Sequence, residues 1–136
     1  MRRFSLAAVV AAVLFSSACS NSTTTPTTPT TTTTTVTDTF AGTLTKNGAS
    51  SYAFSVSSAG FVYATLSSVA DSTSVVGLSL GTWTGASCTI VLANDQAVQG
   101  STIQGQATNL GTLCARVYDV GKSTTPMDYQ ITVVHP

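Results

Sequence analysis

The feature that most constrains this chain is a two-residue alternation of apolar and polar side chains, which begins at residue 39 and recurs almost to the end. It occurs in short segments, such as Ser-Tyr-Ala-Phe-Ser-Val-Ser at 51–57 and Phe-Val-Tyr-Ala-Thr-Leu-Ser at 61–67. Glycine, asparagine, aspartate and serine separate the segments, as is usual for turns between strands. Because successive side chains of a strand point to opposite faces, the segments are predicted to be half-buried β-strands.

About eight such segments follow one another, and no helical periodicity occurs among them. They lie at 39–45, 51–57, 61–67, 75–81, 88–93, 102–108, within 111–121 and at 129–134. Many short strands without helices predict an all-β sandwich or barrel. The wide separation of the first and last strands favours a Greek-key or jelly-roll sandwich of antiparallel strands. Asn47-Gly48 lies between the first two segments and predicts a hairpin there.

The N-terminus has the composition of an export signal. Arg2 and Arg3 precede an apolar segment at 4–15, and Ser16-Ser17-Ala18 supplies small residues for cleavage. An apolar segment of about twelve residues is too short to span a bilayer of ~30 Å. Residues 1–18 are therefore predicted to be a signal peptide.

This leader, followed by Cys19, resembles the signal peptide of bacterial lipoproteins, in which the cysteine becomes the first mature residue and carries lipid. The resemblance implies that lipid on Cys19 anchors the exported protein in the bacterial cell envelope. It departs from the family at Ser16, where leucine is usual. Ordinary cleavage after Ala18, which would give a secreted or periplasmic protein, is the alternative.

The cysteine count agrees with lipidation. Three cysteines leave one without a partner in an exported chain, and acylation of Cys19 leaves Cys88 and Cys114. Disulfides persist in oxidising compartments, so we expect a Cys88–Cys114 bond, with two buried free thiols as the alternative. Alternation places Cys114 opposite Leu113, Ala115 and Val117, so the bond is expected on the outer face of a sheet or at its edge.

Residues 19–37 are mostly threonine, with Pro26 and Pro29 among them. Such a segment buries too little apolar area to offset its ordering entropy, so we expect a disordered linker before a domain at 38–136. A bare spacer is the favoured interpretation and an O-glycosylated stalk is the alternative.

Charged residues make up only 7% of the chain. Without Arg2 and Arg3, three cations face five aspartates, a net charge of −2. Nothing in this balance neutralises a phosphate backbone, so we expect no nucleic-acid partner.

The order of several motifs resembles one known domain. Thr-Asp-Thr-Phe-Ala-Gly-Thr-Leu-Thr comes first, then Gly-Leu-Ser-Leu-Gly, then Gly-Thr-Leu-Cys-Ala-Arg-Val-Tyr-Asp-Val-Gly, then Tyr-Gln-Ile-Thr-Val. Over residues 37–134 this series resembles the bacterial pre-peptidase C-terminal domain. The resemblance implies a jelly-roll sandwich that accompanies secreted hydrolases without being catalytic. This sequence departs from the family in having no enzyme segment before the domain, and in having Leu113 and Cys114 where aromatic residues are usual.

Candidate catalytic groups are few, and we expect no catalytic residue, cofactor or metal. The single histidine, His135, lies where chains fray, and Asp128 or Asp119 could meet it. No Gly-x-Ser-x-Gly motif and no glutamate accompany it. Asp71, Asn94 and Asp95 could supply oxygens to calcium, but turn formation is the favoured role of such residues.

These observations predict a non-enzymatic, monomeric envelope or surface lipoprotein, whose β-sandwich is an accessory interaction or structural module. Its expected partners are the membrane, through the lipid, and an envelope protein or surface glycan. A carbohydrate-binding module is the second hypothesis, with Trp83, Arg116 and Tyr118 as the candidate contacts. A small secreted hydrolase is the third.

Overall fold

The computed structural model describes residues 34–136. The predicted signal peptide, Cys19 and most of the predicted linker lie outside the described residues. The strands are β1 (Val36–Leu44), β2 (Ala49–Val56), β3 (Gly60–Val69), β4 (Val76–Trp83), β5 (Cys88–Ala97), β6 (Thr102–Ala107), β7 (Gly111–Tyr118) and β8 (Met127–His135). In this part of the chain there is no helix long and apolar enough to cross a membrane.

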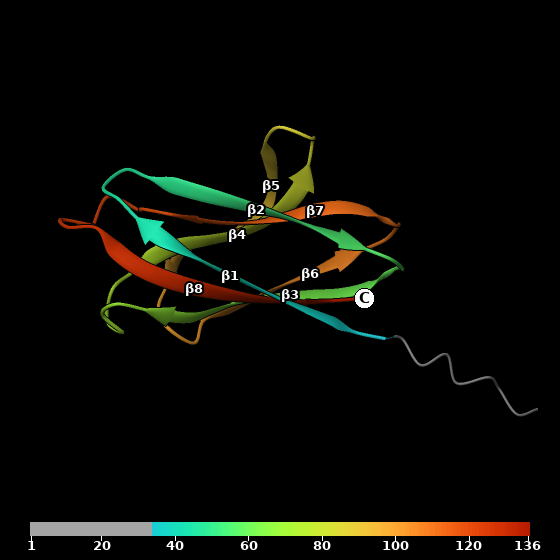
Figure 1. The fold of residues 1–136 in the computed structure, drawn as a ribbon, viewed down its shortest axis with the longest axis horizontal. Helices are drawn as coiled ribbons and strands as arrows, with labels where there is room; N and C mark the ends of the chain where they lie inside the picture. The colour runs from blue at the N-terminus through green and yellow to red at the C-terminus, as the bar shows by residue number, and fades with distance from the viewer. Residues whose placement is uncertain (1–33) are drawn as a thin grey trace, which may run out of the picture. The chain divides into compact units, whose positions relative to one another are not determined.

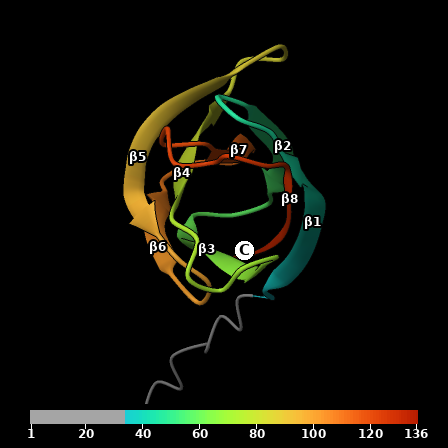
Figure 2. The same ribbon diagram turned by 90° about the vertical axis from the view of Figure 1, so that its left-hand side faces the viewer.

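The eight strands form two four-stranded antiparallel sheets that face each other (Figure 1). Sheet A has the order β1-β8-β3-β6, and sheet B has the order β2-β7-β4-β5. This is the strand order of a jelly roll, so the predicted fold class is confirmed. Figure 2 looks along the domain and shows β1 and β2 closing one side of the sandwich and β5 and β6 closing the other.

The prediction of a hairpin between the first two strands is wrong. The turn forms, with Asn47 at a φ of 56° and the Gly48 N–H donating to the Thr45 carbonyl at 2.8 Å. However, β1 pairs with β8 and β2 pairs with β7. The inward rings of Phe40 and Tyr52 stack with centroids 4.8 Å apart across the interior. β1 and β2 therefore belong to different sheets, and their inward aromatic rings pack against each other across the interior.

Some strand limits also differ from the sequence prediction. β1 begins at Val36, two residues before the predicted domain boundary. β5 continues to Ala97 instead of stopping at Asn94-Asp95. The side chain of Asn94 accepts a hydrogen bond from the Gln96 N–H at 2.9 Å, so this pair sits within an irregular strand without ending it.

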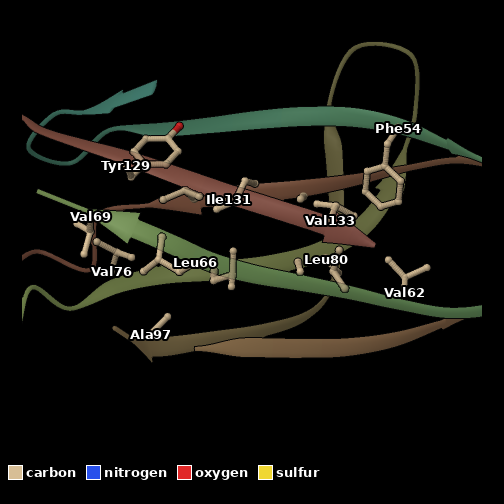
Figure 3. Packing of buried hydrophobic residues seen from close by; sticks show 14 of the residues in the cluster. Phe54, Val62, Leu66, Val69, Val76, Leu80, Ala97, Tyr129, Ile131 and Val133 are labelled. Atoms are coloured by element: carbon tan, nitrogen blue, oxygen red, sulfur yellow. The ribbon is translucent and has the colours of Figure 1, made fainter. Parts of the chain in front are cut away.

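The core lies between the sheets and is built from the alternating apolar residues of both. Val62 and Leu66 from β3, Leu80 from β4, and Ile131 and Val133 from β8 point into this space (Figure 3). An apolar pocket of about 100 Å³ opens at the edge of the core near β5 and β6. Its lining includes Val62, Leu80, Leu92, Gly105 and Leu113.

Candidate functional site

The predicted disulfide is confirmed, and it lies on the outer face of sheet B. Cys88 and Cys114 are joined with their Cα atoms 5.8 Å apart. Leu113, Ala115 and Val117 pack in the core, so Cys114 points away from it, as alternation predicted. Cys114 is nevertheless fully buried, because the start of β5 lies over this face.

Gly81 permits this crossing of β5 over β4. A Cβ atom on Gly81 would lie 2.1 Å from the carbonyl oxygen of Thr89, so no side chain fits between the strands. The register of β4 and β5 shifts between Leu80 and Gly81, as expected for a bulge that bends a strand. The bend raises the β4–β5 turn above sheet B (top of Figure 1) and brings Cys88 over Cys114.

Tyr118 lies flat on the same outer face. Its ring covers Gly77, its partner on β4, so closely that a Cβ there would be 2.2 Å from the ring. Its hydroxyl donates to the Asp95 carboxylate on β5. Burial first, and then this hydrogen bond, raise the pKa of Tyr118 to about 12. Tyr118 therefore spans β4 as a bonded, partly buried side chain.

Arg116 lies beside Tyr118, with its guanidinium carbon 5.9 Å from the ring centroid. It is flanked by Ser51 on β2 and Ser79 on β4. Its Nε is buried and has no hydrogen-bond partner within residues 34–136. The structure thus brings Arg116 and Tyr118 together.

Trp83 is far from these two residues. It lies six positions beyond Gly77 on β4, which at ~3.3 Å per residue is about 20 Å along the strand. Tyr118 pairs with Gly77, whereas Trp83 pairs with Cys88 beside the raised turn. The three predicted glycan contacts therefore share a sheet without forming a single platform.

His135 does not lie in a frayed terminus, and this expectation is corrected. It ends β8 at 3% exposure, with its ring 5.0 Å from that of Phe54. Its Nε2 is 3.1 Å from Asp38, and its Nδ1 is 3.3 Å from the Pro136 carbonyl oxygen. The acidic neighbour is therefore Asp38 and neither Asp128 nor Asp119. No hydroxyl among the described residues bonds to this ring.

Asp71 and Asp95, proposed as calcium ligands, accept hydrogen bonds from other residues. Asp71 accepts from the backbone and hydroxyl of Thr73, and Asp95 accepts from Tyr118. Across residues 34–136, no three His, Cys, Asp or Glu side chains are grouped to hold a metal ion. Turn formation accounts for Asp71, as expected for an aspartate that bonds two residues ahead.

Asp119 ties two loops at one end of the sandwich. Its carboxylate accepts from the Asn47 N–H at 2.8 Å and from the N–H groups of Gly121, Lys122 and Ser123 at 3.0–3.1 Å. The bond from Asn47 is the largest cause that lowers its pKa to about 2. The turn between β1 and β2 is thereby fixed to the loop between β7 and β8.

The feature that the sequence prediction missed is an exposed aromatic pair on sheet A. Phe61 is 53% exposed and Tyr63 is 38% exposed. Their ring centroids lie 6.3 Å apart, with the ring planes tilted by 43°. Both are on the outer face of β3, because Val62 and Ala64 point into the core. The signal was present, since the alternation at 61–67 places two aromatics opposite the apolar set.

Polar side chains border this pair on β6 and follow it along β3. Gln106 lies opposite Phe61 and Gln104 lies opposite Tyr63 on β6, and Thr65 is the next outward residue of β3. The hydroxyls of Thr65 and Thr102 are 2.8 Å apart, and Thr132 continues the same row on β8. We call Phe61, Tyr63, Thr65, Gln104, Gln106 and Thr132 the aromatic face.

A hollow of about 270 Å³ opens next to Phe61 and Tyr63, and is also lined by Thr35, Gly60 and Pro136. Pro136 packs over Gly60, where a Cβ atom would be 3.0 Å from its ring. The Pro136 carbonyl oxygen accepts from the Ser57 N–H at 3.0 Å, so the C-terminal residue is held beside β3 (Figures 1 and 2). A backbone hydrogen bond therefore holds Pro136 in place beside the aromatic pair.

Comparison with protein-family models gives no match, and no curated protein matches the chain. The similarity to the pre-peptidase C-terminal domain therefore stays a prediction, and it depends on the order of the sequence motifs.

Proposed function

We propose that this chain is a non-enzymatic lipoprotein of the bacterial cell envelope, anchored through Cys19, whose β-sandwich is an accessory interaction module. The observation that carries the proposal is the Cys88–Cys114 bond. It leaves Cys19 as the one cysteine outside the bond, directly after the small residues of the leader. A disulfide also favours an oxidising compartment, which agrees with export.

The arrangement around His135 supports a non-enzymatic role. Both ring nitrogens face oxygen acceptors, on Asp38 and on the Pro136 backbone. A Ser-His-Asp triad instead needs one ring nitrogen directed at a nucleophilic hydroxyl. His135 is better explained as a buried side chain that closes the end of β8.

Metabolic labelling of the full chain with a palmitate analogue in a bacterial host tests the anchor. We expect label in the native protein and its location in the membrane fraction. Cys19→Ala should lose the label and move the protein to the soluble fraction. Cys88→Ala is the matched control and should keep the label. A native protein that lacks lipid and begins at an unmodified Cys19 would refute the anchor.

Carbohydrate binding is the second candidate function, and the exposed rings of Phe61 and Tyr63 favour it. Jelly-roll sandwiches are also found in lectin domains. The contacts predicted from sequence, Trp83, Arg116 and Tyr118, stay a prediction, but Tyr118 is engaged with Gly77 and Asp95. Sheet A offers the better-exposed aromatic surface.

A further inference from the structure

We propose that the aromatic face of sheet A binds a single chain of a soluble, neutral polysaccharide, with Phe61 and Tyr63 stacking on consecutive sugar rings. The inference deepens the carbohydrate-binding candidate by naming the face and the class of ligand. It does not depend on the lipid anchor, which concerns a different part of the chain.

The environment of the two rings differs from that of a large protein interface. Exposed aromatics that belong to a large protein interface are surrounded by further apolar side chains, which form a contiguous patch. Here the neighbours opposite them on β6 are Gln106 and Gln104, and Thr65 follows on the same strand. The apolar neighbours are few: Val134 lies opposite Tyr63 on β8, and Pro136 lines the hollow beside the two rings. The face thus alternates ring surfaces with amide and hydroxyl groups.

A sugar chain has the complementary chemistry. One side of a pyranose ring presents C–H groups, which are attracted to the negative face of an aromatic ring. Its rim presents hydroxyls, which donate and accept hydrogen bonds. Glutamine amides and threonine hydroxyls can do both, so they suit a ligand whose hydroxyls do the same. Gln104 and Gln106 are exposed beside the rings and within reach of such a rim.

The charge of the face selects a neutral ligand. Among the outward positions of the four strands of sheet A, the only charged side chain is Asp128. Asp128 lies six positions from Val134, the partner of Tyr63, which is about 20 Å along β8. An acidic polysaccharide or a nucleic acid would find no cation here to pair with.

The tilt between the rings selects a single chain over a crystalline surface. A flat crystal face can lie against two aromatic rings only when the rings are coplanar. The planes of Phe61 and Tyr63 differ by 43°. A flexible chain can turn between consecutive sugars and stack on each ring in turn, and the hollow beside Pro136 gives it room to continue.

Affinity electrophoresis of the full chain tests this proposal. The gels contain laminarin, glucomannan or dextran as neutral chains, or alginate as an acidic one, and separate assays use insoluble cellulose, chitin and poly-L-proline. We expect at least one neutral soluble polysaccharide to retard the native protein and alginate to have no effect. Phe61→Ala and Tyr63→Ala should each weaken binding by about tenfold or more. Gln106→Ala should weaken it less.

Trp83→Ala is the matched control, because it removes an aromatic from the other sheet and should leave binding unchanged. All variants should melt within about 3 °C of the native protein, since the substituted side chains are on outer faces. Absence of retardation in every neutral gel would overturn the proposal, as would loss in Trp83→Ala with retention in Phe61→Ala. Binding only to alginate, to poly-L-proline or to crystalline material would overturn it too.

Self-association gives a further check by sedimentation. The native protein should sediment as a monomer, with or without Phe61→Ala. A dimer that Phe61→Ala dissociates would assign the aromatic face to a second copy of the chain and overturn the proposal. A failed palmitate labelling would leave these binding measurements unaffected, so the two proposals fail separately.

Discussion

Tyr118 on the outer face of sheet B is covered by its contacts, whereas Phe61 and Tyr63 on the outer face of sheet A are exposed. On sheet B, Tyr118 lies on Gly77 and donates to Asp95, and the backbone of β5 at Thr89 covers Gly81. On sheet A, Phe61 and Tyr63 stand beside glutamines with their rings exposed. An outward position in the alternation therefore does not by itself mean an available side chain. Its exposure depends on the residue opposite it on the next strand. A ring can pack flat against a glycine, but the side chain of a glutamine prevents this.

The largest effect that this contrast predicts comes from the disulfide on sheet B. The loop between the cysteines spans 26 residues. Its closure stabilises the fold by about 3.5 kcal/mol on the chain-entropy model. We expect the double variant Cys88→Ala, Cys114→Ala to lose about this much free energy of unfolding in urea titration. A loss below about 1 kcal/mol would mean that the start of β5 stays packed over sheet B without the disulfide.

The next test compares one tyrosine from each face. Tyr118→Ala leaves Gly77 uncovered and Asp95 without its donor, so we expect a loss of about 1–2 kcal/mol, less than the ~3–5 kcal/mol of a fully buried aromatic. Tyr63→Ala should change stability by no more than about 0.5 kcal/mol. Both are measured by urea unfolding. Equal losses of unfolding free energy in the two variants would show that Tyr118 is no more buried in contacts than Tyr63.

A smaller, pH-dependent effect is expected from Asp119, which belongs to neither face. Its folded pKa of about 2 lies below its ordinary value of 3.8. A carboxylate with a lowered pKa stabilises the fold above its unfolded pKa, and this contribution disappears as the pH falls through the folded value. We expect stability to fall between about pH 4 and pH 2.

Asp119→Asn should remove part of that pH dependence. The comparison is of thermal unfolding of both proteins across the acidic range. An unchanged acid profile in the variant would show that other carboxylates, such as Asp71, account for it. Asp71 also has a lowered pKa, mainly because the Thr73 N–H donates to it.

The smallest effect contrasts two glycines in strand interiors. Gly105 lines the apolar pocket at the edge of the core, where a Cβ would meet Leu80 and Leu92 at 3.6–3.7 Å, which is ordinary contact. Gly105→Ala should therefore stabilise the fold by about 0.5–1 kcal/mol. Gly77→Ala is the opposite control, because its Cβ would collide with the Tyr118 ring. Stabilisation by both substitutions would show that Tyr118 is not held against Gly77.

Much of this fold could be predicted from the sequence because alternation is a local property. The strands, the jelly-roll class, the Cys88–Cys114 bond and its place on an outer face all follow from period and cysteine count. The pairing of strands could not be predicted in the same way. Asn47-Gly48 makes the turn that its residues favour, yet the chain leaves that turn into the other sheet.

The candidate site could not be predicted from short segments, because its residues contact neighbours that are distant in the sequence. His135 is held by Asp38, which is 97 positions away in the chain. Trp83 and Tyr118 are both on sheet B, but their positions along β4 differ by six residues. Phe61 and Tyr63 were visible in the sequence as outward residues, but their exposure depended on what β6 and β8 place beside them.

By itself, the sequence determined which segments form strands and which face of each strand is apolar, because both depend on the period of a short segment. It also contains the apolar segment at 4–15, the threonine-rich segment at 19–37 and the three cysteines. Only the tertiary structure decided which outward aromatics are covered and which are open. That outcome depends on registers between strands far apart in the chain, which set Gly77 under Tyr118 and Gln106 beside Phe61.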